Sequence, residues 1–442
     1  MKNPLEKEFT PKSLLKFVFP SSAAMIFVAL YSIIDGFFVA RFINSDALAA
    51  INIVFPAMTV VMGIGIMLAS GGSAIIAKKM GEGDPARARE NFSLIMCGAI
   101  TASCILAAAG AANTDALIKF FGASDRLFPY CRDYLKIIML FFPAIVMQVM
   151  YEFFFVTAGR PLIGLAVTVA AGLTNAALDY FFIAVLAMGI KGAAWATAAG
   201  CLIPVITGTV FFIIRDKPLY FAKPAFDPRV LVQACINGSS EMVANLASSI
   251  TTFMFNISMM KFLGEAGVAA VTAALYTQFL FISLFLGFSN AVAPVISYNY
   301  GMKNFKMLKR VFHICVNFIV FASLAVFLFS ISFSYRIAGI FFKENSPVYA
   351  AAANGFILFS AAYIFAGFNI FASALFTALS NGKVSAVISF ARTFIFIAAG
   401  IVILPKFAGI DGIWLSVPAA EAAALFLSLG FVFAKNKKYG YL

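Results

Sequence analysis

Four polar side chains interrupt otherwise apolar stretches in the first half of the chain. Asp35 lies in the run AAMIFVALYSIIDGFFVARF, and Asn175 and Asp179 lie four residues apart in GLTNAALDYFFIAV. This i, i+4 spacing puts both on one helix face, and Thr197 follows in GIKGAAWATAAG. Two carboxylates, an amide and a hydroxyl are hard oxygen ligands. They suit a small cation such as Na+, or a carboxylate pair that shares a proton.

The composition shows that the medium around these residues is a lipid bilayer. Hydrophobic residues make up 62% of the 442 residues and charged residues 12%, against about 45 to 50% and about 25% in soluble domains. The Lys and Arg residues that give the net charge of +13 lie between apolar runs. This is the pattern of membrane-protein loops, so we expect no nucleic-acid partner. The six cysteines form no CxxC pair and the only histidine is His313, which leaves little material for histidine catalysis or a structural metal.

Apolar stretches bounded by charges, Gly or Pro predict an all-α integral membrane protein with twelve transmembrane helices. The expected ranges are 13–41, 48–79, 90–113, 130–158, 161–186, 190–214, 230–261, 266–299, 306–335, 347–378, 383–404 and 410–434. Alternate connections are rich in Lys and Arg, including both terminal segments. The positive-inside rule therefore predicts a multi-pass protein of the cell membrane with both termini in the cytoplasm.

The two halves of the chain repeat at an offset of 220 residues. Gly81 corresponds to Gly301, each ending a long helix before a basic loop, and GIKG at 189–192 corresponds to GIDG at 409–412. Six crossings separate equivalent points, so a pseudo-two-fold axis along the membrane normal should relate the halves. We expect two six-helix lobes, the N-lobe at 1–214 and the C-lobe at 230–442, joined by a cytoplasmic inter-lobe loop at 215–229.

The polar residues break this symmetry. The same offset carries Asp35, Asn175 and Asp179 onto three apolar residues, which are Phe255, Ile395 and Ala399. At about 1.5 Å per residue, the two aspartates and Thr197 fall at similar depth in the outer half of the membrane. A charge at the centre of the bilayer costs about 2.5 to 3.5 kcal/mol, so each ionisable residue within a span needs an explanation. The alternative, that each side chain only fixes helix packing, explains the matched aspartates less well than a functional site does.

From about residue 12 to 434, the chain resembles the multidrug and toxic compound extrusion (MATE) family of cation-coupled exporters, because several short motifs occur in the same order. The resemblance rests on IIDGFFVARF at 33–42, GEGD at 81–84, Asn175-x-x-x-Asp179 before GIKGAAWAT, APVISYNYG at 293–301 and GIDGIW at 409–414. It implies a twelve-helix antiporter that exchanges Na+ or H+ for an outgoing small molecule. It also implies that Asp35, Asn175, Asp179 and Thr197 form the cation site. We expect a monomer without further cofactors.

Three more positions in the first half are candidates for a role in transport. Pro20, inside the first helix, is either a hinge that responds to Asp35, as the resemblance suggests, or a static kink. Gln148 and Glu152 are spaced i, i+4 in the fourth helix, at positions that the resemblance associates with substrate contact. The family pattern leads us to expect an amide at Glu152. Its carboxylate either favours cationic substrates in the cleft or is a paired or snorkelling group near the inner interface.

In the second half, Arg392 and Glu421 should lie at similar depth on adjacent antiparallel helices. We expect a structural ion pair, with a substrate gate as the alternative. Glu241 lies too early in its helix to match the functional acid that some members of the family carry there.

Other functional classes fit the sequence less well. A flippase of the same fold group, moving a lipid-linked precursor, would need several cationic residues in the cleft, and the chain offers only Arg392 near mid-membrane. A membrane-embedded prenyl transferase would need clustered Asp-rich motifs, whereas the aspartates here are single. There is no Walker loop for ATP. We therefore expect a secondary exporter, not an enzyme.

Overall fold

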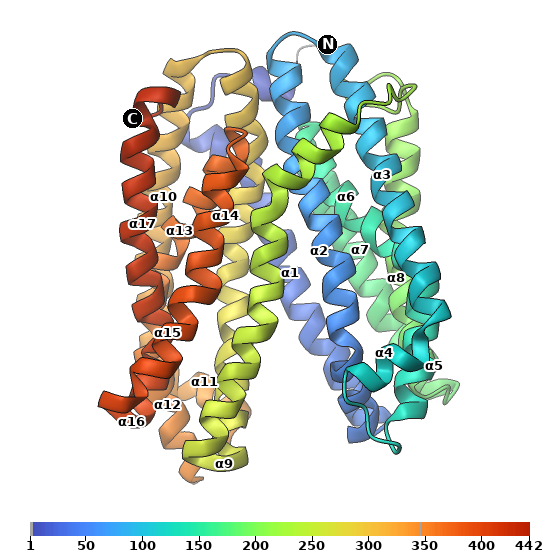
Figure 1. The fold of residues 1–442 in the computed structure, drawn as a ribbon, viewed down its shortest axis with the longest axis vertical. Coiled ribbons are helices and arrows are strands. Elements are labelled where there is room, and N and C mark those ends of the chain that lie inside the picture. The colour runs from blue at the N-terminus through green and yellow to red at the C-terminus, as the bar shows by residue number, and fades with distance from the viewer. Residues whose placement is uncertain (1–2, 345) are drawn as a thin grey trace.

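The computed structural model describes residues 3–344 and 346–442, and almost all of them form helices (Figure 1). The α-helices of the first half are α1 (Pro11–Phe42), α2 (Ser45–Gly81), α3 (Pro85–Ala112), α4 (Thr114–Phe120), α5 (Phe128–Leu140), α6 (Phe142–Thr157), α7 (Pro161–Asp179) and α8 (Ile190–Ile213). The second half has α9 (Pro228–Gly301), α10 (Phe305–Ser332), α11 (Ser334–Phe341), α12 (Pro347–Ser360), α13 (Ala362–Ala378), α14 (Gly382–Phe390), α15 (Phe396–Ile403), α16 (Pro405–Trp414) and α17 (Ser416–Tyr439). A short 3-10 helix, η1 (Pro4–Glu6), and two π-helical segments, η2 (Tyr180–Val185) and η3 (Ala391–Ile395), complete the fold.

The predicted twelve crossings are confirmed within the described residues. Nine helices are long and apolar enough to span a membrane, and two bent pairs, α5 with α6 and α12 with α13, each form a further span. The 74-residue α9 accounts for two crossings, because its backbone reverses at Gly264 (φ 62°, ψ −149°). A glycine is needed there, since positive φ is strained for other residues.

Two of the predicted helices are sharply bent, which the sequence analysis did not anticipate. The fourth span bends by 56° between α5 and α6, where Pro143 lacks an N–H for the helical hydrogen-bond ladder. The tenth span bends by 46° between α12 and α13. There the Ser360 hydroxyl donates to the carbonyl of Phe356, a back-bond of the kind that bends helices.

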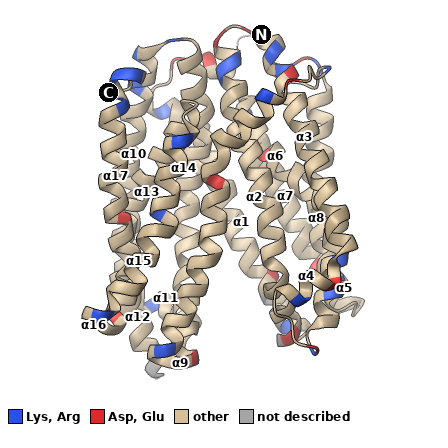
Figure 2. Cartoon of the chain, in the orientation of Figure 1, with Lys and Arg blue, Asp and Glu red and all other residues tan. Residues whose placement is uncertain are grey.

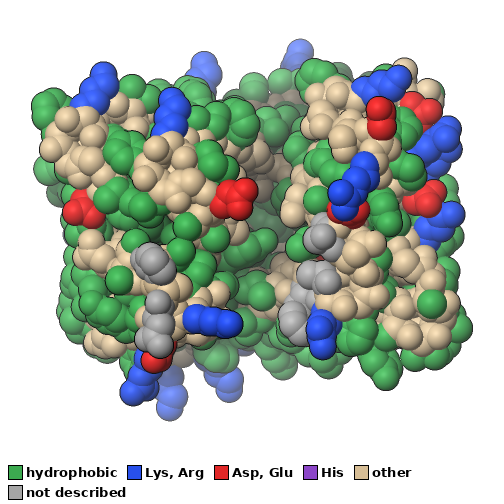
Figure 3. All heavy atoms as spheres, turned by 90° about the horizontal axis from the view of Figure 1, so that it is seen from below, with side chains coloured by type: hydrophobic (Ala, Val, Ile, Leu, Met, Phe, Trp, Pro, Cys, Tyr) green, Lys and Arg blue, Asp and Glu red, His purple; other side chains and the backbone are tan. Residues whose placement is uncertain are grey.

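Helices α1–α8 and α9–α17 form two groups that meet near the chain ends and spread apart at the opposite end (Figure 1). We call these ends the terminus side and the open side. Seen from the open side, the surface is hollowed between the two groups, with hydrophobic side chains along the hollow (Figure 3). Charged residues gather at the two ends of the helices and few lie between them (Figure 2), as expected for a membrane protein.

Glycines bring the two groups into backbone contact on the terminus side, where α2 packs along α9. A Cβ atom at Gly81 would overlap the carbonyl oxygen of Tyr298, and one at Gly301 would overlap that of Lys78. Tyr298 and Lys78 are themselves 220 residues apart, so the two contacts are equivalent under the internal repeat. The pseudo-two-fold axis therefore passes between Gly81 and Gly301.

The connection between α8 and α9 packs against the first group rather than crossing open space. Arg89 of α3 donates hydrogen bonds to the carbonyl oxygen of Pro218 (3.0 Å) and to the hydroxyl of Tyr220 (3.1 Å). The Phe221 ring stacks on Phe92, with 4.9 Å between ring centroids. This loop is thus fixed to the terminus side by polar and aromatic contacts.

The expected ion pair between Arg392 and Glu421 is present in the second group. The Arg392 Nε atom donates to both carboxylate oxygens of Glu421, at 2.7 and 2.9 Å. Asn369 of α13 also donates to this carboxylate, at 2.8 Å. The two charged side chains are only 12% and 3% exposed. Their charges are matched and hydrogen-bonded, which is the condition under which a buried pair is tolerated.

Gly301→Ala is expected to open the terminus side, because its methyl group would overlap the Lys78 carbonyl. Gly430→Ala is a matched control, since nothing lies within 4 Å of a Cβ at that helical position. Both changes raise helix propensity by about 1 kcal/mol, so only the contact differs. Double electron–electron resonance measures the distance between two spin labels placed at the exposed positions Arg87 and Lys306. This distance should be longer in the Gly301→Ala variant and unchanged in the Gly430→Ala variant. An unchanged distance in the Gly301→Ala variant would contradict the contact.

Glu421→Gln should lower the free energy of unfolding by about 3 to 5 kcal/mol, because it leaves the Arg392 charge buried without a partner. Asp46→Asn, which removes the exposed pair with Arg126, should cost at most about 1 kcal/mol. Unfolding of the purified protein in detergent measures both. A double change to Met at Arg392 and Glu421 should recover most of the loss, whereas equal losses in the single and double variants would refute the pairing argument.

Candidate functional site

The first group of helices contains two aspartates whose carboxyl groups face each other. Asp35 projects from α1 and Asp179 from the last turn of α7, and the two side chains lie within interaction distance. Asp179 is fully buried. Among residues 3–344 and 346–442, none donates a hydrogen bond to either of its carboxylate oxygens or to Oδ1 of Asp35. No Lys or Arg in the described part of the chain forms an ion pair with either residue.

Two tyrosines that the sequence analysis did not single out complete the surroundings of the pair. Tyr134 of α5 is buried. Its hydroxyl approaches Thr197 of α8 and lies near both aspartates. Tyr31 precedes Asp35 by one helical turn, so it lies on the same face of α1 and its hydroxyl is close to the Asp35 carboxyl. The i−4 spacing of Tyr31 was a signal in the sequence, whereas nothing in the sequence pointed to Tyr134.

Asn175 lies on the face of α7 that carries Asp179, and it is buried. Its Cβ packs 3.1 Å from the position that a Cβ would take at Gly200. Gly200 follows Thr197 by three residues in α8, so this small residue lets the two helices approach closely. The structure thus brings all four predicted residues to one region between α1, α7 and α8.

The oxygen atoms of these four side chains could bind a single small cation or share a proton. Two carboxylates without hydrogen-bond donors are costly to bury when ionised, and a bound monovalent cation or a proton would remove that cost. Within the described residues, no group of three or more His, Cys, Asp or Glu side chains is arranged to hold a metal ion. Asp35 and Asp179 would supply the charge, and Asn175 and Thr197 the neutral oxygens.

Glu152 lies inside the first group of helices. Its carboxylate accepts a hydrogen bond from Gln148 at 3.3 Å, approaches Thr168 of α7, and lies near Tyr31 and Cys201. Tyr31 therefore lies near both Glu152 and Asp35. Gln148 and Glu152, the residues expected to contact substrate, are thus connected through Tyr31 to the surroundings of the aspartate pair.

Pro20 is buried within α1, which continues as one helix from Pro11 to Phe42. Two residues further on, α1 meets α9, since a Cβ at Gly287 would lie 2.5 Å from the Cα atom of Ser22. The predicted hinge therefore borders a contact between the two groups of helices.

π-helical turns occur beside charged residues in both halves. The segment η2 begins directly after Asp179, and η3 contains Arg392. The helices concerned, α7 with η2 and α14 with η3 and α15, correspond in the internal repeat. Such insertions re-aim side chains and are frequent at functional sites, and the sequence analysis did not predict them.

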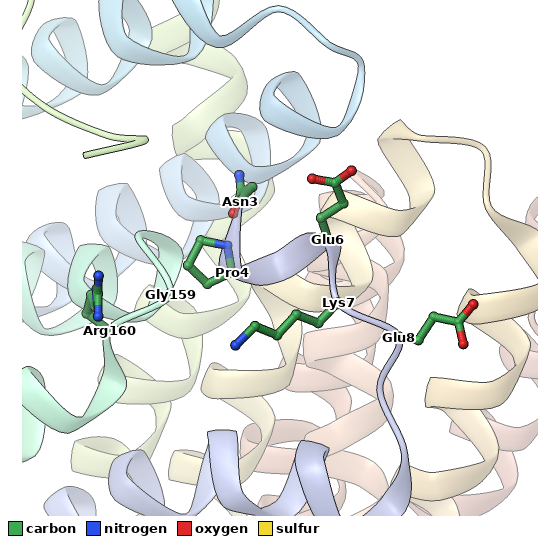
Figure 4. Close-up of a pocket in the computed structure, with 7 residues that line it drawn as sticks. All are labelled: Asn3, Pro4, Glu6, Lys7, Glu8, Gly159 and Arg160. Carbon is green, nitrogen blue, oxygen red and sulfur yellow. The ribbon is translucent and has the colours of Figure 1, made fainter. Parts of the chain in front are cut away.

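A separate surface pocket lies on the terminus side, at the N-terminal segment (Figure 4). The Lys7 side chain extends into it toward Arg160, whereas Glu6 and Glu8 point away. Gly159 allows Pro4 to pack closely, because a Cβ there would overlap the proline ring. This pocket contains none of the predicted cation-site residues.

Comparison with known proteins identifies the family of the chain. The family model MatE matches residues 20–181 and 242–402. The multidrug export protein MepA of Staphylococcus haemolyticus is 22% identical over 431 residues, covering 97% of this chain and 94% of that protein. MepA of Staphylococcus aureus strain N315 is 23% identical with the same coverage of both chains.

Solved structures share the whole fold. An outward-facing multidrug resistance MATE family transporter of the MOP superfamily superimposes with a TM-score of 0.91 at 21% identity, over 100% of this chain and 99% of that one. A crystal structure of MATE in complex with MaD5 gives a TM-score of 0.92 at 20% identity, over 100% of both chains. MATE transporters have twelve helices in two lobes, which confirms the predicted fold class. The chain belongs to the MatE family and is a membrane transporter, not an enzyme.

Proposed function

We propose that the protein is a secondary multidrug exporter that exchanges Na+ or H+ for amphipathic, cationic small molecules by alternating access. The observation that carries this proposal is the pair of Asp35 and Asp179, in which no described residue donates a hydrogen bond to Oδ1 of Asp35 or to either oxygen of Asp179. A pair of opposite charges would be neutral without a bound ion. Two buried carboxylates carry charges of the same sign, so a cation or a proton is needed to offset the cost of burying them. The printed function of the MepA relatives, multidrug export, supports the substrate class.

We further assign residues 1–214 to the N-lobe, 215–229 to the inter-lobe loop and 230–442 to the C-lobe, with both termini in the cytoplasm. With this orientation the open side faces outward. Arrival of the cation at Asp35, Asn175, Asp179 and Thr197 would then occur from outside. Pro20 is the position in α1 where the backbone could bend in response. Gln148 and Glu152 would link the cation site to the bound compound, and the protein would act as a monomer.

Asp35→Asn and Asp179→Asn are each expected to reduce gradient-driven export to near background, because a neutral amide cannot exchange a cation or proton. Export of a fluorescent cationic compound from proteoliposomes under an imposed Na+ or H+ gradient measures this, and the gradient that drives wild-type export identifies the ion. Asp133→Asn, which removes an exposed carboxylate paired with Lys191, should leave export unchanged. Undiminished coupled export in both site variants would overturn the assignment.

The orientation is tested by labelling single cysteines in a variant whose six natural cysteines are replaced. Both test positions are exposed lysines, Lys119 in α4 on the open side and Lys437 near the C-terminus. A membrane-impermeant maleimide should label a cysteine at position 119 in intact cells. It should label one at position 437 only after permeabilisation. The reverse pattern would place the termini outside.

A further inference from the structure

A second polar site lies between the two groups of helices, apart from the aspartate pair. It is a small cavity of about 10 Å3, lined by Ser70 and Ser73 of α2, Glu241 and Asn290 of α9, and Thr377 of α13. A cavity of this size holds about one water molecule, and a dehydrated Na+ ion is smaller than water. Because α2 belongs to the first half of the chain and α9 and α13 to the second, the walls of this cavity come from both halves.

On the α2 wall, proton accounting leaves Ser73 as a hydrogen-bond acceptor toward the cavity. The Thr157 hydroxyl donates its only proton to the carbonyl of Phe153, at 3.0 Å. The Ser73 and Thr157 hydroxyl oxygens are 2.7 Å apart. While Thr157 donates to Phe153, the proton between these two oxygens comes from Ser73. No other hydrogen bond to the Ser73 hydroxyl is present in the described part of the chain.

The α13 wall follows the same logic. Ser385 donates to the carbonyl of Ser373, at 2.8 Å. Thr377 lies 2.8 Å from the Ser385 hydroxyl oxygen and 3.4 Å from that of Ser240. While Ser385 donates to Ser373, the proton between Thr377 and Ser385 comes from Thr377. Thr157, which is hydrogen-bonded to Ser73, and Thr377, which lines the cavity, are equivalent in the internal repeat.

Glu241 supplies the negative charge. No hydrogen bond to its carboxylate is present among the described residues, in which only its backbone carbonyl accepts one, from Asn245. The Arg392 guanidinium interacts electrostatically with it, and the Nε atom of Arg392 donates to both oxygens of Glu421. The three charges together leave one negative charge in excess. The other residues that line the cavity, from α2, α6, α9 and α13, are uncharged.

We infer that this cavity is a second site for a small hard monovalent cation, Na+ or hydronium, which bridges the two lobes. Its lining offers a carboxylate and hydroxyl lone pairs, the ligands that such ions prefer. Because Ser70 and Ser73 belong to α2 whereas Glu241 and Thr377 belong to the C-terminal half, an ion there stabilises the closed terminus side. Opening that side requires its release. This consequence rests on the proposed alternating access, but the binding itself does not.

The test uses the purified full chain carrying Asp35→Asn and Asp179→Asn, so that the first site no longer responds. Replacing choline chloride by NaCl at fixed pH is expected to raise its melting temperature by a few degrees. It should also narrow the distance distribution between spin labels at Arg87 and Lys306. Adding Glu241→Gln should abolish both responses, whereas Glu265→Gln, which removes an exposed charge from the same helix, should preserve them.

A second pair of variants covers the case in which Glu241→Gln does not fold. Thr377→Val removes the hydroxyl at nearly constant volume and should raise the half-saturating Na+ concentration about tenfold, a change worth about 1.4 kcal/mol. Thr377→Ser should restore it. A response to acid in place of Na+ would identify hydronium as the occupant. No response to either, or a response that survives Glu241→Gln, would overturn the inference. Failure of the exporter proposal would instead appear as uncoupled transport with these binding responses intact.

Discussion

The backbone contact between α2 and α9 is the constraint on which the arrangement of the two lobes depends. Gly81 and Gly301 allow the helices to meet at carbonyl distance, and their neighbours Tyr298 and Lys78 are related by the same repeat. Apolar surface gives little driving force for helix association within lipid, so close packing of small residues has to supply it. Such a contact is strong when formed, yet it can separate without breaking a hydrogen-bond network. That combination suits a transporter whose lobes must alternately meet and part.

The symmetric frame holds charges that are arranged asymmetrically. In the C-terminal half, Arg392 and Glu421 neutralise each other within hydrogen-bond distance. In the N-terminal half, Asp35 and Asp179 face each other with the same sign and without donors. The first arrangement is complete within the protein, whereas the second needs a ligand to be stable in a low-dielectric medium. One half is therefore suited to hold its shape and the other to respond to an ion.

Glu241 joins these two properties at the boundary between the lobes. Arg392 donates its Nε–H to Glu421, whereas the Glu241 carboxylate receives no hydrogen bond from a described residue and lines the inter-lobe cavity. An ion bound there would add a charge-dependent attraction to a contact that otherwise depends on backbone packing. The proposed coupling would thus act at the boundary between the lobes as well as at Asp35 and Asp179.

Much of this protein was determined by the sequence alone. Hydropathy predicted the twelve crossings because each span must satisfy its own backbone in lipid, and the repeat at 220 residues predicted that Gly81 and Gly301 are equivalent. The cost of burying charge identified Asp35, Asp179, Arg392 and Glu421. Only the tertiary structure decided that Tyr134 joins the aspartates, that Glu152 points into the N-lobe, and that Glu241 faces α2. Periodicity reports which face of a helix is apolar, but helix bends, π-helical turns and crossing angles decide which distant side chains meet.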